Sequence, residues 1–203
     1  MGKIAKLVGL GVILFAVMLA FELHRRSLPP EELKSYRGLS AVSSNDTLEV
    51  KMERLAEQAA LDAWNRARVP VHIGIHSLPE YERYLGLISN SPWFQAASEK
   101  DKHAEGLIGG AFIGEAIRRT HGGRWLERAP DLPDAGGYPL QVGTSTIWPV
   151  NWCLKRLVNG PEDNTYDKYV YLILKRTNDV NGEVTHWTNT DSGLKQITNT
   201  TTK

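Results

Sequence analysis

The residues best suited to chemistry lie in the stretch "GEAIRRTHGG", residues 114–123. Glu115 supplies a carboxylate, Arg118 and Arg119 supply guanidinium groups, and His121 supplies an imidazole. Such groups act as acid, base and anion-binding groups when their side chains come within hydrogen-bond reach of one another. One hypothesis is therefore an enzyme of unknown class with a cleft around Glu115, Arg118 and His121, joined by Glu162.

The spacing of these residues also has a structural explanation, and we favour it. Arg118 and Arg119 follow Glu115 by three and four positions, the spacing of ion pairs along one helix. Cations in a last turn complement the carbonyl end of a helix, and the glycines after His121 can end one. Glu162 and Asp163 lie in "PED", where carboxylates suit the start of a later helix. The pattern names no reaction and no catalytic residue.

The remaining cysteine and histidines predict no metal site and no cofactor. Cys153 is the single cysteine, so it forms no internal disulfide and no Cys-rich zinc site, and "NWCLKR" favours a core position for it. His72 and His76 alternate with apolar residues in "VPVHIGIHS", which predicts a short strand. On a strand they would lie about 13 Å apart, too far to share one ion.

Composition narrows the classes of partner. The chain is 41% hydrophobic and 23% charged, which is typical of a folded globular protein. Lysine and arginine total 24 against 23 for aspartate and glutamate, so no net charge favours nucleic acid. We expect neither nucleic acid nor a small-molecule cofactor as a partner.

An uncharged run of 15 residues, Leu7–Phe21, lies near the amino terminus. As a helix it reaches about 22 Å, against about 30 Å for a hydrocarbon core, but its apolar neighbours extend it and Lys6 can snorkel. We predict a transmembrane anchor or signal anchor at residues 1–23, with membrane contact through residues 4–23. A cleaved signal peptide and a buried helix are the alternatives.

The charges beside this segment bear on its orientation. Lys3 and Lys6 precede it, whereas Arg25, Arg26, Lys34 and Arg37 come after it. The count favours a cytoplasmic body, but a short basic tail before the first apolar segment is also usual for an anchor that exports the rest of its chain. We expect a single pass through a bacterial inner membrane with the body on the periplasmic side. Residues 24–46, with two prolines and several serines, predict a flexible linker.

Helix signals dominate residues 47–176, which we expect to form an α+β domain. Helix starts are predicted near Thr47, Ser77, Ser91 and Ser98. The helix that follows Ser98 carries glycines at intervals of four, at positions 106, 110 and 114. Each costs about 0.8 to 1 kcal/mol relative to alanine, so close packing against a neighbouring element must compensate. A phosphate-binding loop is the disfavoured alternative, because a polar segment precedes the glycines instead of a strand.

The second half of the chain predicts a small antiparallel meander followed by more helix. The runs "RWLERAP", "GYPLQVG" and "STIWP" are β-prone and separated by turn residues. Two helices then follow, the second led by Pro161, and a hairpin around Asn181-Gly182 with a loose tail occupies residues 177–203. The predicted fold is α+β: a single transmembrane helix, then several helices packed with a small sheet.

The order of three motifs resembles a family of small bacterial domains with no assigned biochemical function. The motifs are a Gly-x-x-x-Gly-Glu helix, a Gly-Gly-x-Trp strand and Lys-Arg-Leu-x-Asn-Gly-x-Glu-Asp, within residues 50–176. The resemblance implies an α+β fold and no catalytic residues. With the anchor, it favours a membrane-anchored, non-catalytic protein-binding module, immunity-like or envelope-associated. Its candidate binding residues are Glu115, Arg118, Arg119, His121, Glu162 and Asp163.

Overall fold

The computed structural model describes residues 30–128, 137–174, 183–190 and 193–200. The predicted anchor, residues 1–23, and the first part of the linker lie outside these residues. Within the described ranges, none of the helices has the length and apolar character needed to cross a membrane. The body is mostly helical with a small three-stranded antiparallel sheet, which confirms the α+β prediction.

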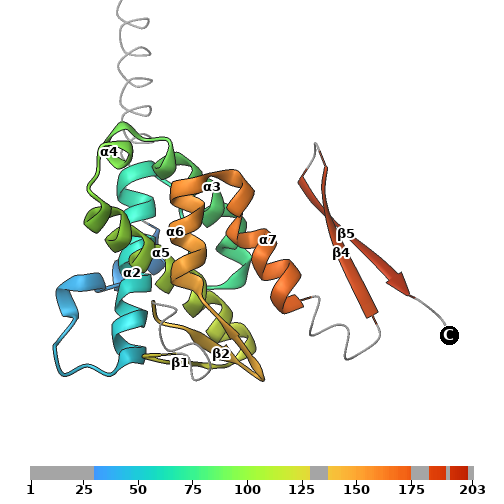
Figure 1. Cartoon of the computed structure of the whole chain (residues 1–203), viewed down its shortest axis with the longest axis horizontal. Coiled ribbons are helices and arrows are strands. Elements are labelled where there is room, and N and C mark those ends of the chain that lie inside the picture. Colours follow the sequence, from blue (N-terminus) through green and yellow to red (C-terminus); the bar gives the residue numbers. More distant parts are fainter. Residues whose placement is uncertain (1–29, 129–136, 175–182, 191–192, 201–203) are drawn as a thin grey trace, which may run out of the picture.

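The body is built around α5, which packs against both α2 and α6 (Figure 1). The α-helices are α2 (Leu48–Ala67), α3 (Leu78–Ser89), α4 (Pro92–Gln95), α5 (Glu99–His121), α6 (Pro149–Asn159) and α7 (Thr165–Tyr169). The predicted helix starts near Thr47, Ser91 and Ser98 are confirmed, since each residue caps its helix through its side-chain oxygen.

The glycine stripe of α5 faces α6 and the sheet. A methyl group on Gly110 would overlap the backbone of Val150, and one on Gly114 would overlap the ring of Trp125. A methyl group on Gly106 would crowd Leu154. The prediction of close helix packing is therefore confirmed, and the glycines are the condition for α5 to approach α6 this closely.

The predicted meander is also confirmed. It consists of β1 (Arg124–Trp125), β2 (Leu140–Val142) and β3 (Ser145–Ile147), paired antiparallel in that order. Trp125 pairs with Leu140, and Leu140 pairs with Ile147. These three side chains are buried, so one face of the sheet completes the core beside α5.

The predicted strand at Val71–Ile75 is wrong. Val71 and Ile73 are buried and His72 is exposed, as alternation requires, but no strand pairs with this segment among the described residues. Side-chain oxygens accept the backbone hydrogen bonds that a neighbouring strand would accept in a sheet. The backbone N–H of Ile73 donates to Tyr36 Oη, and that of His72 donates to Ser77 Oγ. The segment ends in a 3₁₀ turn, η3 (Ile75–Ser77).

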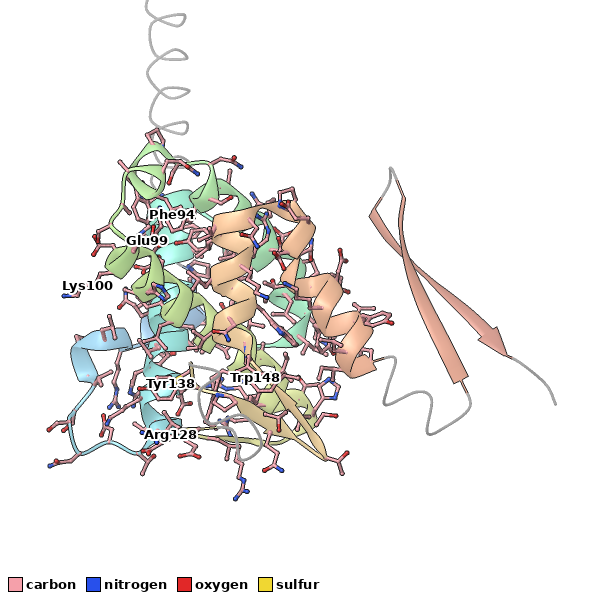
Figure 2. The ribbon with its side chains drawn as sticks, viewed as in Figure 1. Phe94, Glu99, Lys100, Arg128, Tyr138 and Trp148 are labelled. Carbon is pink, nitrogen blue, oxygen red and sulfur yellow. The ribbon has the colours of Figure 1, made fainter. Side chains whose placement is uncertain are left out.

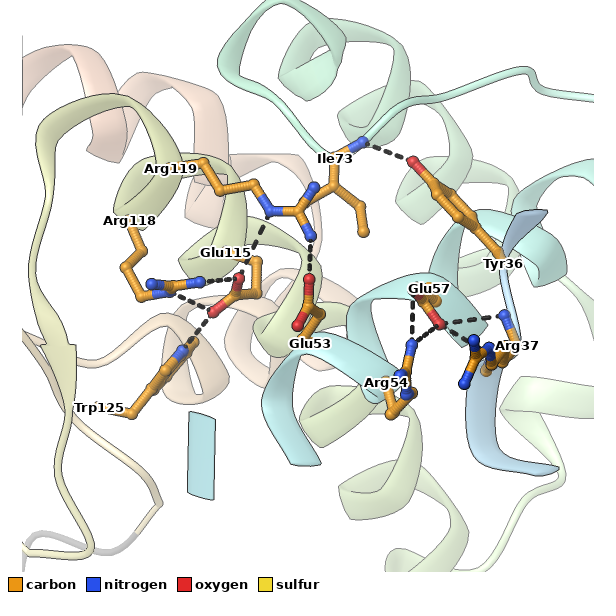
Figure 3. Close-up of polar contacts among 11 residues, drawn as sticks. Tyr36, Arg37, Glu53, Arg54, Glu57, Ile73, Glu115, Arg118, Arg119 and Trp125 are labelled. Atoms are coloured by element: carbon orange, nitrogen blue, oxygen red, sulfur yellow. Dashed lines mark hydrogen bonds and ion pairs between the residues drawn. The ribbon is translucent and has the colours of Figure 1, made fainter. Parts of the chain in front are cut away.

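From Pro30 onward, the segment expected to be a flexible linker lies against α2. It forms two 3₁₀ turns, η1 (Glu31–Ser35) and η2 (Gly38–Ala41), and the side chain of Leu33 is fully buried. The buried carboxylate of Glu57 accepts hydrogen bonds from the backbone N–H groups of Arg37 and Gly38, at 3.0 and 3.2 Å (Figure 3). Since Glu57 sits on α2, these bonds fix the segment to the body.

Two predictions for the carboxyl-terminal part need correction. The helix expected from Pro161 is divided into η4 (Pro161–Asp163), then α7, which Asn164 caps, and a π-helical turn, η5 (Val170–Leu174). The hairpin pairs β4 (Glu183–Thr190) with β5 (Gly193–Thr200). Its connection therefore lies between Thr190 and Gly193, and not around Asn181-Gly182.

Candidate functional site

The carboxylate of Glu115 is fully buried, on the face of α5 that meets the core. Arg118, one turn further along, holds it with two parallel hydrogen bonds, Nε to Oε1 at 2.7 Å and Nη2 to Oε2 at 2.9 Å. The hydrogen bond to Glu115 raises the pKa of Arg118. The predicted ion pair along the helix is confirmed, and both carboxylate oxygens are occupied by it.

Two further contacts extend this pair to neighbouring elements. The indole Nε1 of Trp125 donates to Glu115 Oε1 at 2.7 Å, which ties β1 to α5. Arg119 places Nε 3.6 Å from Glu115 Oε2 and donates from Nη2 to Glu53 Oε1 at 2.7 Å, which ties α5 to α2. Figure 3 shows these contacts converging around the carboxylate of Glu115. These contacts join α5 to β1 and to α2.

His121, the last residue of α5, faces a different element. Its Nε2 lies 3.0 Å from the hydroxyl of Tyr169 on α7. Burial lowers the pKa of His121 and raises the pKa of Tyr169 to about 12. Within the described part of the chain, no side-chain hydrogen bond joins His121 to Glu115. The imidazole therefore fastens α7 to the end of α5.

Glu162 and Asp163 lie in η4, and the two behave differently. Glu162 is exposed. Asp163 accepts hydrogen bonds from Lys168 Nζ and from Asn159 Nδ2, and these bonds, the one from Lys168 foremost, lower the pKa of Asp163. The six predicted residues thus form three separate groups, centred on Glu115, on His121 and on Asp163.

Asp163 lines a cavity of about 270 Å³ between α6 and the α7 segment, which we call the α6–α7 cavity. Its walls combine aromatic, aliphatic and charged side chains, from Trp148, Asn151, Trp152, Lys155, Asp163, Lys168 and Leu172. Trp148 stands where β3 leads into α6, at the base of that helix (Figure 2). Its indole Nε1 is buried and has no hydrogen-bond partner in the described structure.

Trp148, with its unpartnered indole N–H, shares the lining of this cavity with two lysines. A buried donor without an acceptor costs about 1 to 3 kcal/mol, which a ligand with an acceptor would recover. Lys155 is exposed, and Lys168 forms an ion pair with Asp163. By charge and apolar surface, this lining is compatible with a carboxylate carried on an apolar stem.

Sequence reasoning found Asp163 but missed the residues opposite it. Trp148, Trp152 and Lys155 follow one another at intervals of four and three in "WPVNWCLK", so they share one face of α6. The spacing of these three residues could have been recognised in the sequence. It predicts that they share a helix face, but it does not predict that the indole N–H of Trp148 lacks an acceptor in the folded protein.

Cys153 behaves as expected from the sequence. Cys153 is fully buried, and burial raises the pKa of its thiol well above the ordinary value, so it is a core residue. No group of three or more histidine, cysteine, aspartate or glutamate side chains suited to a metal ion occurs in the ranges that the structure describes.

Comparison of the chain with protein-family models, with curated proteins and with solved structures finds no match. The resemblance drawn from the three motifs therefore stays a prediction.

Proposed function

We propose that this protein is a membrane-anchored, non-catalytic protein-binding module whose α6–α7 cavity receives a carboxylate of its partner. The observation that carries the proposal is the buried indole N–H of Trp148, which lacks an acceptor in the described structure and belongs to the wall of that cavity. Tryptophan is enriched among the residues that dominate binding energy at protein interfaces.

The groups that suggested catalysis support this choice over the alternative of an enzyme. The fully buried carboxylate of Glu115 accepts three hydrogen bonds from Arg118 and Trp125, and His121 Nε2 lies beside the hydroxyl of Tyr169. A general base needs a free lone pair within hydrogen-bond reach of the proton that it takes. The enzyme hypothesis has less support, because Glu115, His121 and Glu162 have separate surroundings in the described structure.

The membrane part of the proposal rests on the apolar run Leu7–Phe21. An anchor there would display the body at the surface of a bacterial inner membrane, on its periplasmic side, where an envelope complex or a toxin to be neutralised is a fitting partner. A topology reporter fused after Lys203 tests the side. Reporter activity in the cytoplasm would reverse the proposed orientation.

Photo-crosslinking in membranes tests the binding site. A photoreactive phenylalanine replaces Leu172 at the cavity in one variant and Leu107 in a matched control, because both leucines are half-buried on helical segments. We expect a discrete protein adduct from position 172 alone, and loss of that adduct when Trp148→Phe removes the N–H but keeps an aromatic ring. An adduct that survives Trp148→Phe, or equal labelling from both positions, would contradict the proposed site.

A further inference from the structure

A second cavity, of about 330 Å³, lies where α3 and α6 end, and we call it the Arg156 cavity. Its walls come from Ser89 and Asn90 at the end of α3, from Gln95 of α4, and from residues 156–161. Among the described residues, it shares no lining residue with the α6–α7 cavity. Its polar side chains are those of Ser89, Asn90, Gln95, Arg156 and Asn159, so its chemistry differs from that of the tryptophan-lined cavity.

Arg156, which lines this cavity, carries a donor without an acceptor. The residue is 6% exposed, and its Nε donates to Glu82 Oε1. The other oxygen of Glu82 accepts from the backbone N–H of Thr165 at 3.0 Å and from its hydroxyl at 2.6 Å. Nη1 of Arg156 is buried and has no hydrogen-bond partner in the described structure. A guanidinium presents its donors in a fixed fork, so the bond to Glu82 holds Nη1 in place.

The charge around Nη1 argues for a neutral ligand. Glu82 compensates the charge of Arg156, and Arg156 is the only charged side chain among the described residues that line the cavity. The last turns of α3 and α6 both end here, and a helix presents partial negative charge at its carboxyl end. A full anion would meet that negative field without a second cation, whereas an uncharged carbonyl oxygen needs only the single N–H.

Two side chains of the wall offer the complementary acceptors. Gln95 donates its Nε2 to the carbonyl of Ser89, and Asn159 donates its Nδ2 to Asp163. With both amide nitrogens engaged, the amide oxygens of Gln95 and Asn159 remain as acceptors. One fixed donor and two acceptors match a group that has one carbonyl oxygen and one NH₂ group.

We propose that the Arg156 cavity binds a primary carboxamide, with its oxygen on Nη1 of Arg156 and its NH₂ toward Gln95 and Asn159. The group belongs to a free small amide or to a glutamine or asparagine side chain of a peptide. The proposal does not rest on the α6–α7 interface, although Asn159 also donates to Asp163 in the wall of that cavity.

Ligand-observed NMR on the full chain in detergent micelles tests the site. The probes are N-acetylglutamine methylamide, its glutamate counterpart as an isosteric carboxylate, and propionamide as a free amide. We expect saturable binding of the glutamine probe, about tenfold tighter than that of the glutamate probe. Propionamide binding as tightly as the glutamine probe identifies a free amide as the source, and much weaker binding identifies a peptide side chain. Binding of the glutamate probe with equal affinity, or no binding of either amide, would overturn the proposal.

Variants assign the binding to this cavity. Gln95→Leu and Asn159→Leu remove exposed acceptors, and each is expected to weaken the glutamine probe about fivefold, whereas Asn65→Leu, an exposed position on α2, leaves it unchanged. Arg156→Lys is expected to abolish binding. Because this variant also loses the contact with Glu82, it can fail to fold, and in that case the two leucine variants test the assignment. Unchanged affinity in both leucine variants would contradict the assignment.

Discussion

The indole of Trp125 donates its N–H to Oε1 of Glu115 at 2.7 Å, so a strand residue satisfies a carboxylate that is fully buried on α5. Arg118 bonds to the same carboxylate. The most chemically suggestive residues of the sequence thus serve to join α5 to the sheet.

Removing that N–H should therefore cost stability. Trp125→Phe keeps a ring in the core but leaves one oxygen of a buried carboxylate short of a donor, and we expect a loss of about 2 kcal/mol in the free energy of unfolding. Urea denaturation measures it. Arg83→Gln, which breaks an exposed pair with Glu80, is the control and should cost no more than about 0.5 kcal/mol. Equal losses in the two variants would show that the Trp125 bond adds nothing.

Gly110 tests the packing of α5 on α6. Gly110→Ala gains about 1 kcal/mol of helix propensity, but the methyl group would overlap the backbone of Val150, so we expect a net loss of about 1 to 3 kcal/mol. Thermal unfolding checks the sign. Gly74→Ala is the matched control, since no atom lies within reach of its methyl group, and it should leave stability unchanged or slightly raised. A stabilised Gly110→Ala protein would mean that the two helices are free to separate.

His121 should make the protein less stable in mild acid. Burial holds its pKa below the ordinary value of about 6.5, so the unfolded chain binds a proton before the folded one as the pH falls. The stability contributed by the neutral imidazole is therefore complete above about pH 6.5 and is lost as the pH falls from there toward the lowered pKa. Urea denaturation at pH 7.5 and 5.5 measures the loss (about 1 pH unit on either side of the ordinary value). His121→Gln should reduce the slope, and an unchanged slope would assign it to other groups.

The sequence predicted the helices of the body better than their surroundings, and the reasons are physical. Caps such as Thr47 and Ser98 act within one turn, so their spacing is readable along the chain. The alternation around Ile73 correctly separated buried from exposed side chains, but a strand also needs a neighbouring strand. Here the hydroxyl of Tyr36, which is distant in sequence, accepts the hydrogen bond from the backbone N–H of Ile73. Likewise, the burial of Glu57 under residues 30–41 depends on a contact that no local pattern records.

In the candidate sites too, local features were predictable from the sequence and those that depend on distant contacts were not. The ion pair of Glu115 with Arg118 is a local, helical spacing and was predictable. The orphaned donors of Trp148 and Arg156 were not, because whether a donor finds an acceptor is known only once every neighbour is in place.

We propose that the indole N–H of Trp148 donates to a carboxylate of the partner in the α6–α7 cavity. The most direct measurement is the ¹⁵N–¹H resonance of that indole, assigned with Trp148→Phe, during titration with N-acetylglutamate methylamide. We expect a saturable downfield shift that the isosteric glutamine probe does not reproduce and that Lys155→Gln weakens. A resonance that stays in place, or that moves equally with both probes, would contradict the claim.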